Sequence, residues 1–202
     1  MNLKKIKQHS INNKKFFIKG FFIDKKICQD LIEYFEKNKE LQKKGAVKGN
    51  SPKYKISDIK ISTDISIPPE HYDNIVIKKY FISLSKCLEE YKKIFPFCST
   101  NTFEWRITEL INIQKYNPKE GFFKWHNERI GMSDLNNKRH LVFMTYLNSL
   151  KNGGTEFFHQ KLKLKAEQGL TVIWPADWTY THKGTVSLTE KKYIATGWYS
   201  FI

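Results

Sequence analysis

A histidine and an acidic residue stand two positions apart in the segment FKWHNE, as His126 and Glu128. If this segment is a β-strand, both side chains project from the same face, because side chains alternate along a strand. An imidazole beside a carboxylate supplies two ligands of the 2-His-1-carboxylate triad, which leaves open positions on Fe(II) for a chelating cosubstrate and O₂. The pair alone is a weak signal, since six histidines and 20 acidic residues produce such a spacing by chance about as often as not.

A third ligand has to come from a distant strand, and His182 in the segment THKG lies near the end of the β-rich region. Ten residues later, Lys192 opens the last predicted strand, where it could neutralise the remote carboxylate of 2-oxoglutarate. A fixed cation is needed there because a buried carboxylate without a partner is costly. Taken separately, each residue has a plainer interpretation, His182 as a surface histidine at a strand end and Lys192 as a solvated lysine beside Lys191.

The other chemically versatile side chains have simpler interpretations. His140 and His159 are predicted to be structural or surface histidines, and the five tryptophans to be core or pocket-wall residues first. Among the tryptophans, Trp178 is the better candidate to line a substrate entrance, because it precedes His182 by four residues. Arg139 is interpreted either as a substrate contact or as one half of a surface ion pair.

The elements that must position these residues begin at about residue 103. From there, short segments rich in β-branched and aromatic residues follow one another, and the turn-forming clusters NPKEG, SDLNNK and KNGG separate several of them. Many short strands at such spacing are typical of a sandwich or barrel and not of a parallel α/β sheet. The sequence therefore predicts an eight-strand, barrel-like sandwich formed by ITELINIQKY, FFKWHNE, RHLVFMTYLN, TEFFHQ, LKLKA, LTVIWP, THKGTVSL and KKYIATGWYSF.

The first half of the chain has helical patterns. Residues 24–41 are predicted to form a helix that Asp24 can cap, and residues 70–95 a second helix that Pro96 ends. The polar, turn-rich residues 43–55 are expected to form a mobile loop. The predicted buried side of the second helix consists of Ile75, Phe81, Leu84, Leu88, Tyr91 and Phe95.

The length of 202 residues suits one domain that buries its own core. The sequence shows no repeat and no linker, which predicts a single domain over 1–202, with a helical support in 1–100 and the β core in 103–202. No window offers the roughly 20 apolar residues of a membrane span, and the N-terminus develops no secretion signal. Three scattered cysteines are expected to be ordinary thiols in a reducing cytoplasm.

The chain is strongly basic, with a formal net charge of +15. Fifteen lysines against five acidic residues lie in residues 1–55, whereas the whole chain has only three arginines. A nucleic-acid partner is one interpretation of this charge, but specific recognition of bases and phosphates favours the planar fork of arginine. The composition therefore does not favour nucleic acid as the substrate.

Four ordered blocks of the sequence resemble one family. The segment QKYNPKEGFFKWHNE is similar to the Q-x-Y…G-x-F-x-x-H-x-D stretch of prolyl 4-hydroxylase-like Fe(II)/2-oxoglutarate-dependent dioxygenases, with Tyr116, Gly121, Phe123 and His126 at matching positions. HLVFMTYLN followed by GGTEFF resembles the family's tyrosine-bearing strand and its Gly-Gly hairpin. THKG and KKYIATGWYSF resemble its distal histidine, basic residue and tryptophan strand. The resemblance covers about residues 103–202 and extends weakly to the helix FIDKKICQDLIEYF.

The resemblance implies a mainly β fold with N-terminal helices (α+β) around a double-stranded β-helix, the jelly-roll or cupin-like core. It implies that His126, Glu128 and His182 bind Fe(II) and that Lys192 pairs with the distal carboxylate of 2-oxoglutarate. Tyr146 is expected to hydrogen-bond the cosubstrate, and Tyr116 to face the cosubstrate or the substrate. Glu128 departs from the family, which usually has aspartate at this position. Glutamate is one methylene longer, so its carboxylate must fold back or the strand must shift.

The activity that the resemblance implies is hydroxylation of a prolyl or similar residue of a peptide or protein, with O₂ as oxidant. A first alternative is hydroxylation of a free amino acid or another small metabolite. A second is a non-catalytic, cupin-like metal-binding module, although a metal site alone needs no cationic residue such as Lys192. A third is a nucleic-acid demethylase; demethylases of the alkylation-repair type characteristically place arginines after the distal histidine, where this chain has only lysines.

Overall fold

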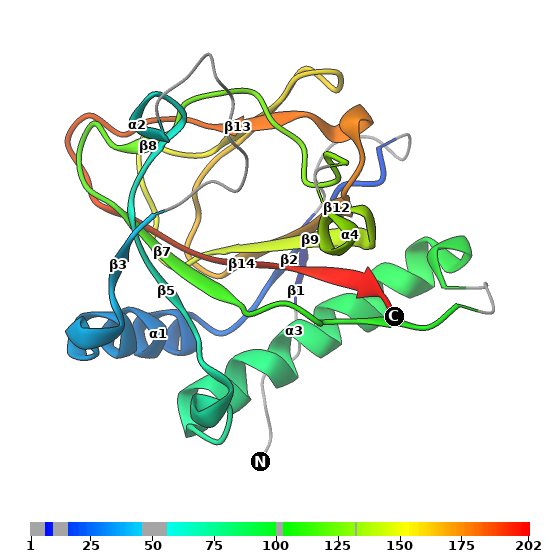
Figure 1. Cartoon of the computed structure of the whole chain (residues 1–202), viewed down its shortest axis with the longest axis horizontal. Helices are drawn as coiled ribbons and strands as arrows, with labels where there is room; N and C mark the ends of the chain where they lie inside the picture. Colours follow the sequence, from blue (N-terminus) through cyan, green and yellow to red (C-terminus); the bar gives the residue numbers. More distant parts are fainter. Residues whose placement is uncertain (1–6, 10–15, 46–55, 100–102, 132) are drawn as a thin grey trace.

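The computed structural model describes residues 7–9, 16–45, 56–99, 103–131 and 133–202, and in these ranges most strands pair into one antiparallel sheet (Figure 1). The sheet has the order β1-β2-β12-β9-β14-β7-β5-β3, and β6 pairs with the far end of β14. Its strands are β1 (Lys7–His9), β2 (Lys19–Phe22), β3 (Lys43–Lys44), β5 (Thr63–Ser66), β6 (Trp105–Arg106), β7 (Asn112–Tyr116), β9 (Arg139–Tyr146), β12 (Leu170–Pro175) and β14 (Lys192–Phe201).

A second layer of short strands lies across from this major sheet. It contains the antiparallel set β11-β10-β13 and the pair β4-β8. An isolated bridge between His126 and His182 connects the two parts of this layer. The two layers form the predicted double-stranded β-helix. Seven of the eight predicted segments hold one strand of it, whereas FFKWHNE shares only Phe122 with β8. The strands of the second layer are β4 (Lys60–Ile61), β8 (Gly121–Phe122), β10 (Thr155–Phe157), β11 (Leu162–Leu164) and β13 (His182–Gly184).

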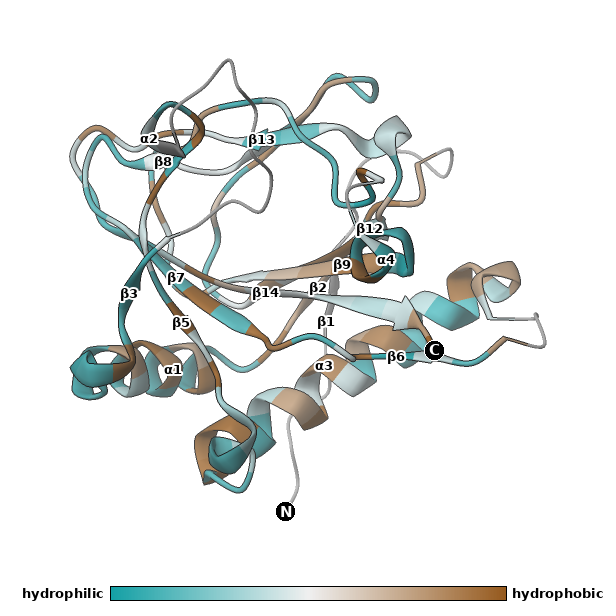
Figure 2. Ribbon diagram, in the orientation of Figure 1, coloured by the Kyte–Doolittle hydropathy of each residue, from teal (hydrophilic) through white to brown (hydrophobic). Residues whose placement is uncertain are grey.

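Two long helices, α1 (Lys25–Lys37) and α3 (Ile75–Ile94), cover the side of the major sheet that faces away from the second layer (Figure 1). In Figure 2, hydrophobic and hydrophilic residues alternate around both helices, as expected for helices that bury one side. The other described helical segments are single turns: α2 (Ile56–Ile59), α4 (Asp134–Asn137), and the 3₁₀ turns η1 (Lys39–Leu41), η2 (Pro69–His71), η3 (Pro96–Cys98) and η4 (Trp178–Tyr180).

Alternation along the central strands divides the core into two parts. On β9, Leu141 and Phe143 pack under the helices, whereas Val142 and Met144 face the interior of the β-helix. On β14, Ile194 also faces the interior, and its two neighbours on the strand therefore face the helices. The sheet is therefore buried on both sides, as its near-continuous apolar strands require.

The first predicted helix forms with the predicted cap. The Asp24 side chain accepts a hydrogen bond from the Lys26 backbone N–H at 2.9 Å, and α1 ends at Lys37, before a 3₁₀ turn that occupies the rest of the predicted range. The second helix starts later than predicted. Asn74 caps α3, so the segment from Pro69 to His71 is a separate turn.

The predicted buried side of the second helix was partly wrong. Leu84 and Tyr91 are buried, but Ile75 is 60% exposed because it is the first residue of the helix and has no preceding turn to pack against. The buried side follows a slightly different helical phase, in which small and polar-tipped residues alternate with apolar ones. Its residues are Ile77, Tyr80, Ser83, Leu84, Cys87 and Tyr91.

Besides the two long helices, the described residues before position 100 contribute five strands. β2 extends the major sheet beside β12, and β5 extends it beside β7. Part of the predicted loop 43–55 is ordered, since Lys43 and Lys44 form β3 against β5; residues 46–55 lie outside the described residues. The three cysteines are free thiols. Within the described ranges, no helix has the length and apolar character needed to cross a membrane.

Candidate active site

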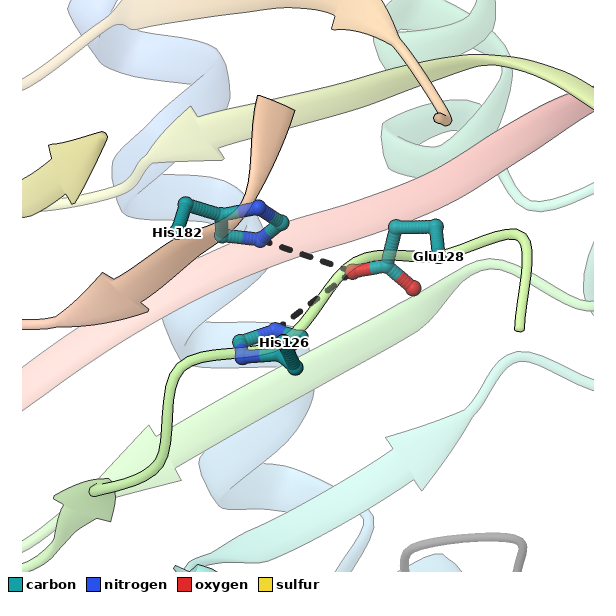
Figure 3. A group of neighbouring side chains, drawn as sticks. All are labelled: His126, Glu128 and His182. Atoms are coloured by element: carbon teal, nitrogen blue, oxygen red, sulfur yellow. Dashed lines mark ion pairs between the residues drawn. The ribbon is translucent and has the colours of Figure 1, made fainter. Parts of the chain in front are cut away.

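Three side chains meet inside the β-helix, between the second layer and the major sheet (Figure 3). The Nε2 atoms of His126 and His182 each lie 3.5 Å from Oε1 of Glu128. One potential ligand atom from each residue lies within 4.8 Å of the other two. The structure thus brings together the histidine and the acid that stand two residues apart with a histidine more than fifty residues away.

The local backbone differs from the predicted strand FFKWHNE. Strand β8 ends at Phe122, and His126 forms only a single bridge, in which its N–H and that of His182 donate to each other's carbonyl oxygens at 2.9 and 2.8 Å. The N–H groups of Glu128 and Arg129 both donate to the Ala176 carbonyl, at 3.2 and 3.0 Å. The side chains of His126 and Glu128 therefore point into the same space because backbone hydrogen bonds to His182 and Ala176 hold this loop. Strand alternation is not the cause.

Hydrogen bonds fix the orientation of both imidazoles. Nδ1 of His126 lies 3.0 Å from the Lys124 carbonyl, and Nδ1 of His182 lies 3.0 Å from the Tyr180 carbonyl. A carbonyl oxygen can only accept, so Nδ1 carries the proton in each ring and Nε2 presents its lone pair. Two lone pairs and a carboxylate oxygen then face one another, an arrangement that is unfavourable unless a cation lies between them. The donor set and its arrangement fit a divalent transition metal.

Aromatic rings hold the two imidazoles in place. Phe122 stacks on His126 with ring centroids 3.6 Å apart and an angle of 17° between the planes. His182 lies against Phe157 and Trp174, with centroids 5.6 and 5.1 Å away. This packing restricts both rings before any ligand binds, which lowers the entropy that binding must remove.

The electrostatics of the three residues favour the ligand forms. Burial, together with the neighbouring His182, lowers the pKa of His126 below its ordinary value, so the ring is neutral at neutral pH. Burial raises the pKa of the Glu128 carboxyl, but the adjacent His126 and His182 outweigh this effect and hold the pKa well below its ordinary value. Neutral imidazoles and an ionised carboxylate are the protonation states that metal binding needs.

Lys192 is a buried cation next to the strand that carries His182. Its side chain is 5% exposed, and its Nζ lies 3.3 Å from the Thr185 carbonyl and 4.9 Å from the centroid of the Tyr116 ring. A Cβ on Gly184 would lie only 3.3 Å from Nζ, so this glycine lets the ammonium approach β13. Among the described residues no carboxylate pairs with Lys192, whereas the adjacent Lys191 is exposed. An unpaired buried ammonium fits an anionic ligand such as 2-oxoglutarate.

The two predicted tyrosines lie on the same interior side as Lys192. Tyr116 stands opposite Lys192 in the β14-β7 pair, and its hydroxyl donates to Gln114 Oε1 at 2.6 Å. Tyr146 stands opposite Ile194 in the β14-β9 pair, and its hydroxyl donates to Thr155 Oγ1 at 2.6 Å. Both rings are buried and belong to the interior core.

The remaining histidines lie elsewhere in the fold. His140 Nε2 lies 2.9 Å from the Cys98 carbonyl, and its ring contacts Trp105 and Phe201. His159 lies at the surface between Phe158 and the 64% exposed Trp178. Neither belongs to the group of three potential ligands.

Arg139 forms an ion pair, as one of its two interpretations from the sequence held, but the expected surface position was wrong. It is 6% exposed and forms an ion pair with Glu109 beside the carboxylate of Glu128, which also accepts a hydrogen bond from Trp198. Sequence reasoning assigned no role at this site to Glu109 or Trp198. The one available signal was that a chain with three arginines places one of them at the start of an apolar strand.

Comparisons with known proteins agree with this geometry. Residues 111–200 match the model of the 2OG-Fe(II) oxygenase superfamily. Among solved structures, a viral collagen prolyl hydroxylase from Paramecium Bursaria Chlorella virus-1 in complex with 2OG is similar, with a TM-score of 0.66 and 20% identity, over 93% of this chain and 98% of that one. No match was found among curated proteins.

Two further solved structures share the fold. A prolyl-4-hydroxylase from Pseudomonas putida gives a TM-score of 0.66 at 11% identity, over 92% of this chain and 94% of that one. A prolyl hydroxylase from Trichoplax adhaerens, in complex with a hypoxia inducible factor peptide, gives 0.62 at 13% identity, over 86% and 76%. The β-helix, the group of three potential metal ligands and the family match over residues 111–200 together support an Fe(II)- and 2-oxoglutarate-dependent dioxygenase.

Proposed function

We propose that this dioxygenase hydroxylates a prolyl or similar residue of a peptide or protein, with Fe(II) held by His126, Glu128 and His182. The convergence of two Nε2 lone pairs and one carboxylate oxygen supports the iron site. The similar solved structures, which include prolyl hydroxylases and one peptide complex, support the substrate class. We also propose that residues 1–202 act as one catalytic domain. A cytoplasmic location stays a prediction from the sequence.

Lys192 is proposed to anchor 2-oxoglutarate through its distal carboxylate. This role favours catalysis over a bare metal-binding module, because such a module has no use for a buried ammonium that lacks a carboxylate. We propose that Tyr146 donates a hydrogen bond to the cosubstrate by exchanging its present acceptor, Thr155. Tyr116 is proposed to form the wall beside Lys192, where its ring already contacts the ammonium.

The chain's own residues bind and orient the metal and the cosubstrate, and they exclude water from the site. The chemistry that Fe(II) and 2-oxoglutarate supply when bound is activation of O₂, with decarboxylation of the cosubstrate to succinate and CO₂ coupled to C–H hydroxylation. His126 and His182 keep their protons on Nδ1 and leave Nε2 for the metal. Phe122, Phe157 and Trp174 surround the imidazoles and keep this side of the site apolar.

A succinate-formation assay with Fe(II), 2-oxoglutarate and O₂ tests the proposed substrate class. The protein is offered prolyl peptides, free amino acids and methylated oligonucleotides in separate reactions. We expect prolyl peptides to stimulate succinate formation and to gain one oxygen atom, as measured by mass spectrometry. Stimulation by free amino acids alone would support the small-metabolite alternative and overturn the peptide proposal. Stimulation by oligonucleotides with release of formaldehyde would overturn it in favour of a demethylase.

The pH dependence of cosubstrate binding follows from the environment of Lys192. Burial lowers the pKa of this ammonium to about 8, so the ligand-free site loses its cation as the pH rises through that value. Both carboxylates of 2-oxoglutarate stay ionised throughout, because their ordinary pKa values are about 4. Above about pH 8, binding must therefore take up a proton, and we expect the affinity to fall by up to about tenfold per pH unit.

This expectation is checked by equilibrium binding of 2-oxoglutarate to the Mn(II)-loaded protein between about pH 7 and pH 9.5. The Lys192→Met variant is the control, since it has no ammonium and should bind weakly with little dependence on pH. Constant affinity of the unsubstituted protein over this range would contradict the role of Lys192.

A further inference from the structure

A buried guanidinium lies directly behind the Glu128 carboxylate. Nε and Nη2 of Arg139 donate to the two carboxylate oxygens of Glu109 at 2.7 and 2.6 Å, which is a bidentate pair. The side chains of Arg139 and Glu109 are only 8% and 9% exposed. Two long side chains are thus fixed against each other in a desolvated place, where this geometry is stronger than a surface ion pair.

The remaining nitrogen of the guanidinium points at Glu128. Nη1 of Arg139 lies 3.1 Å from the Glu128 carbonyl and 3.4 Å from its Oε2. Trp198 donates from Nε1 to the same Oε2 at 3.0 Å, and the guanidinium stacks on the Trp198 ring, 3.5 Å from its centroid. Oε2 therefore has two donors, which leaves Oε1 as the oxygen that faces the two histidines.

A β-bulge explains how Arg139 reaches this position. In the β9-β14 register, Leu141 pairs with Tyr199 and Arg139 with Ser200, so His140 is an extra residue on β9. Strict alternation would put Arg139 on the helix-covered side of the sheet with Leu141. The extra residue shifts the phase and turns Arg139 to the interior, where it meets Trp198.

We infer that Glu109, Arg139 and Trp198 form a clamp that positions Glu128, so that Oε1 alone is offered to the metal. Glutamate has one more rotatable bond than aspartate, so its carboxylate has more freedom and can exchange its two oxygens. The clamp limits this freedom of the longer side chain. Holding Oε2 on two fixed donors removes that freedom before the metal arrives. Arg139 and Trp198 act through Glu128 and are positioning residues. The inference rests on the proposed iron site.

The clamp is tested by Co(II) titration of the metal-free protein, with the Co(II) absorption spectrum as a second readout. Trp198→Phe keeps an aromatic ring for the guanidinium but removes the Nε1–H donor. We expect it to weaken Co(II) binding by about tenfold, in the range usual for partners of metal ligands, and to change the spectrum. Trp105→Phe is the matched control, because Trp105 packs against His140 and Tyr199 and has no hydrogen bond to Glu128.

A double-mutant cycle separates positioning from general destabilisation. In a Glu128→Asp background the shorter carboxylate cannot reach Nε1 of Trp198 in the same way, so Trp198→Phe should cost little further affinity. The same tenfold loss in both backgrounds, or no loss in either, overturns the clamp. Failure of the iron site itself gives a different result, since Glu128→Ala would then bind Co(II) as tightly as the unsubstituted protein.

Discussion

His126→Ala and His182→Ala are each expected to lose most of their Fe(II) affinity and all turnover. Each variant removes one of three proposed ligand atoms that lie within 4.8 Å of one another, and the two that remain cannot hold iron in the facial geometry. The lost Nε2 also leaves the Glu128 carboxylate facing a single imidazole. Anaerobic Fe(II) titration of the metal-free protein measures the affinity, and succinate formation measures turnover.

The two histidines outside the site are the controls for this result. His140→Ala and His159→Ala should keep both metal binding and turnover, because His140 is held by the Cys98 carbonyl and His159 lies among surface aromatic rings. Thermal unfolding of each variant shows whether the fold is intact. If His159→Ala were inactive while His182→Ala stayed active, the assignment of the metal ligands would be wrong.

Lys192→Met is expected to raise the apparent dissociation constant of 2-oxoglutarate by roughly ten- to hundredfold. The ammonium is 5% exposed and lacks a carboxylate partner among the described residues, so a bound carboxylate gains a charge-assisted hydrogen bond of about 1.5–3 kcal/mol. Each 1.4 kcal/mol corresponds to about a factor of ten in the binding constant. Methionine keeps much of the volume of lysine, so the variant isolates the loss of charge.

Lys191→Met is the matched control for this variant. Lys191 is exposed, and the preceding position on a strand points to the opposite side of the sheet. Cosubstrate titrations should therefore give nearly the same constant for Lys191→Met as for the unsubstituted protein, and Fe(II) binding should survive in both variants. A larger cosubstrate defect in Lys191→Met would show that the anchor has been assigned to the wrong lysine.

Much of the fold could be predicted from the sequence because the relevant signals are local. The Asp24 cap and the apolar spacing that follows it specify α1 within a few residues. The period of two along KKYIATGW predicts that only one of two adjacent lysines faces the interior, and the family resemblance selects Lys192, which is buried. Seven of the eight predicted β-rich segments contain a strand, because turn-forming clusters mark the ends of several of them.

The features that could not be predicted depend on partners far away in the sequence. β2 has only four residues and forms because it pairs with β12, which lies far away in the sequence. No local sequence pattern indicates this pairing. The backbone from Lys124 to Glu128 is shaped by hydrogen bonds to residues after position 175, and so its departure from a strand is invisible in FKWHNE. Arg139 looked like a surface residue because a buried arginine requires partners, and its partner Glu109 lies 30 residues away.

The bulge in β9 makes the candidate site depend on the number of residues as well as on their identity. Side chains along a strand alternate between its two sides. The extra residue His140 shifts this alternation once, between the part of β9 that packs in the core and Arg139, which contacts the Glu128 carboxylate. Substitution of His140 preserves this alternation. Deletion of His140 would turn Arg139 to the other side of the sheet and leave the side chains from Leu141 onward where they are. The core side chains of β9 and the arginine that contacts Glu128 thus depend on different sides of the same bulge.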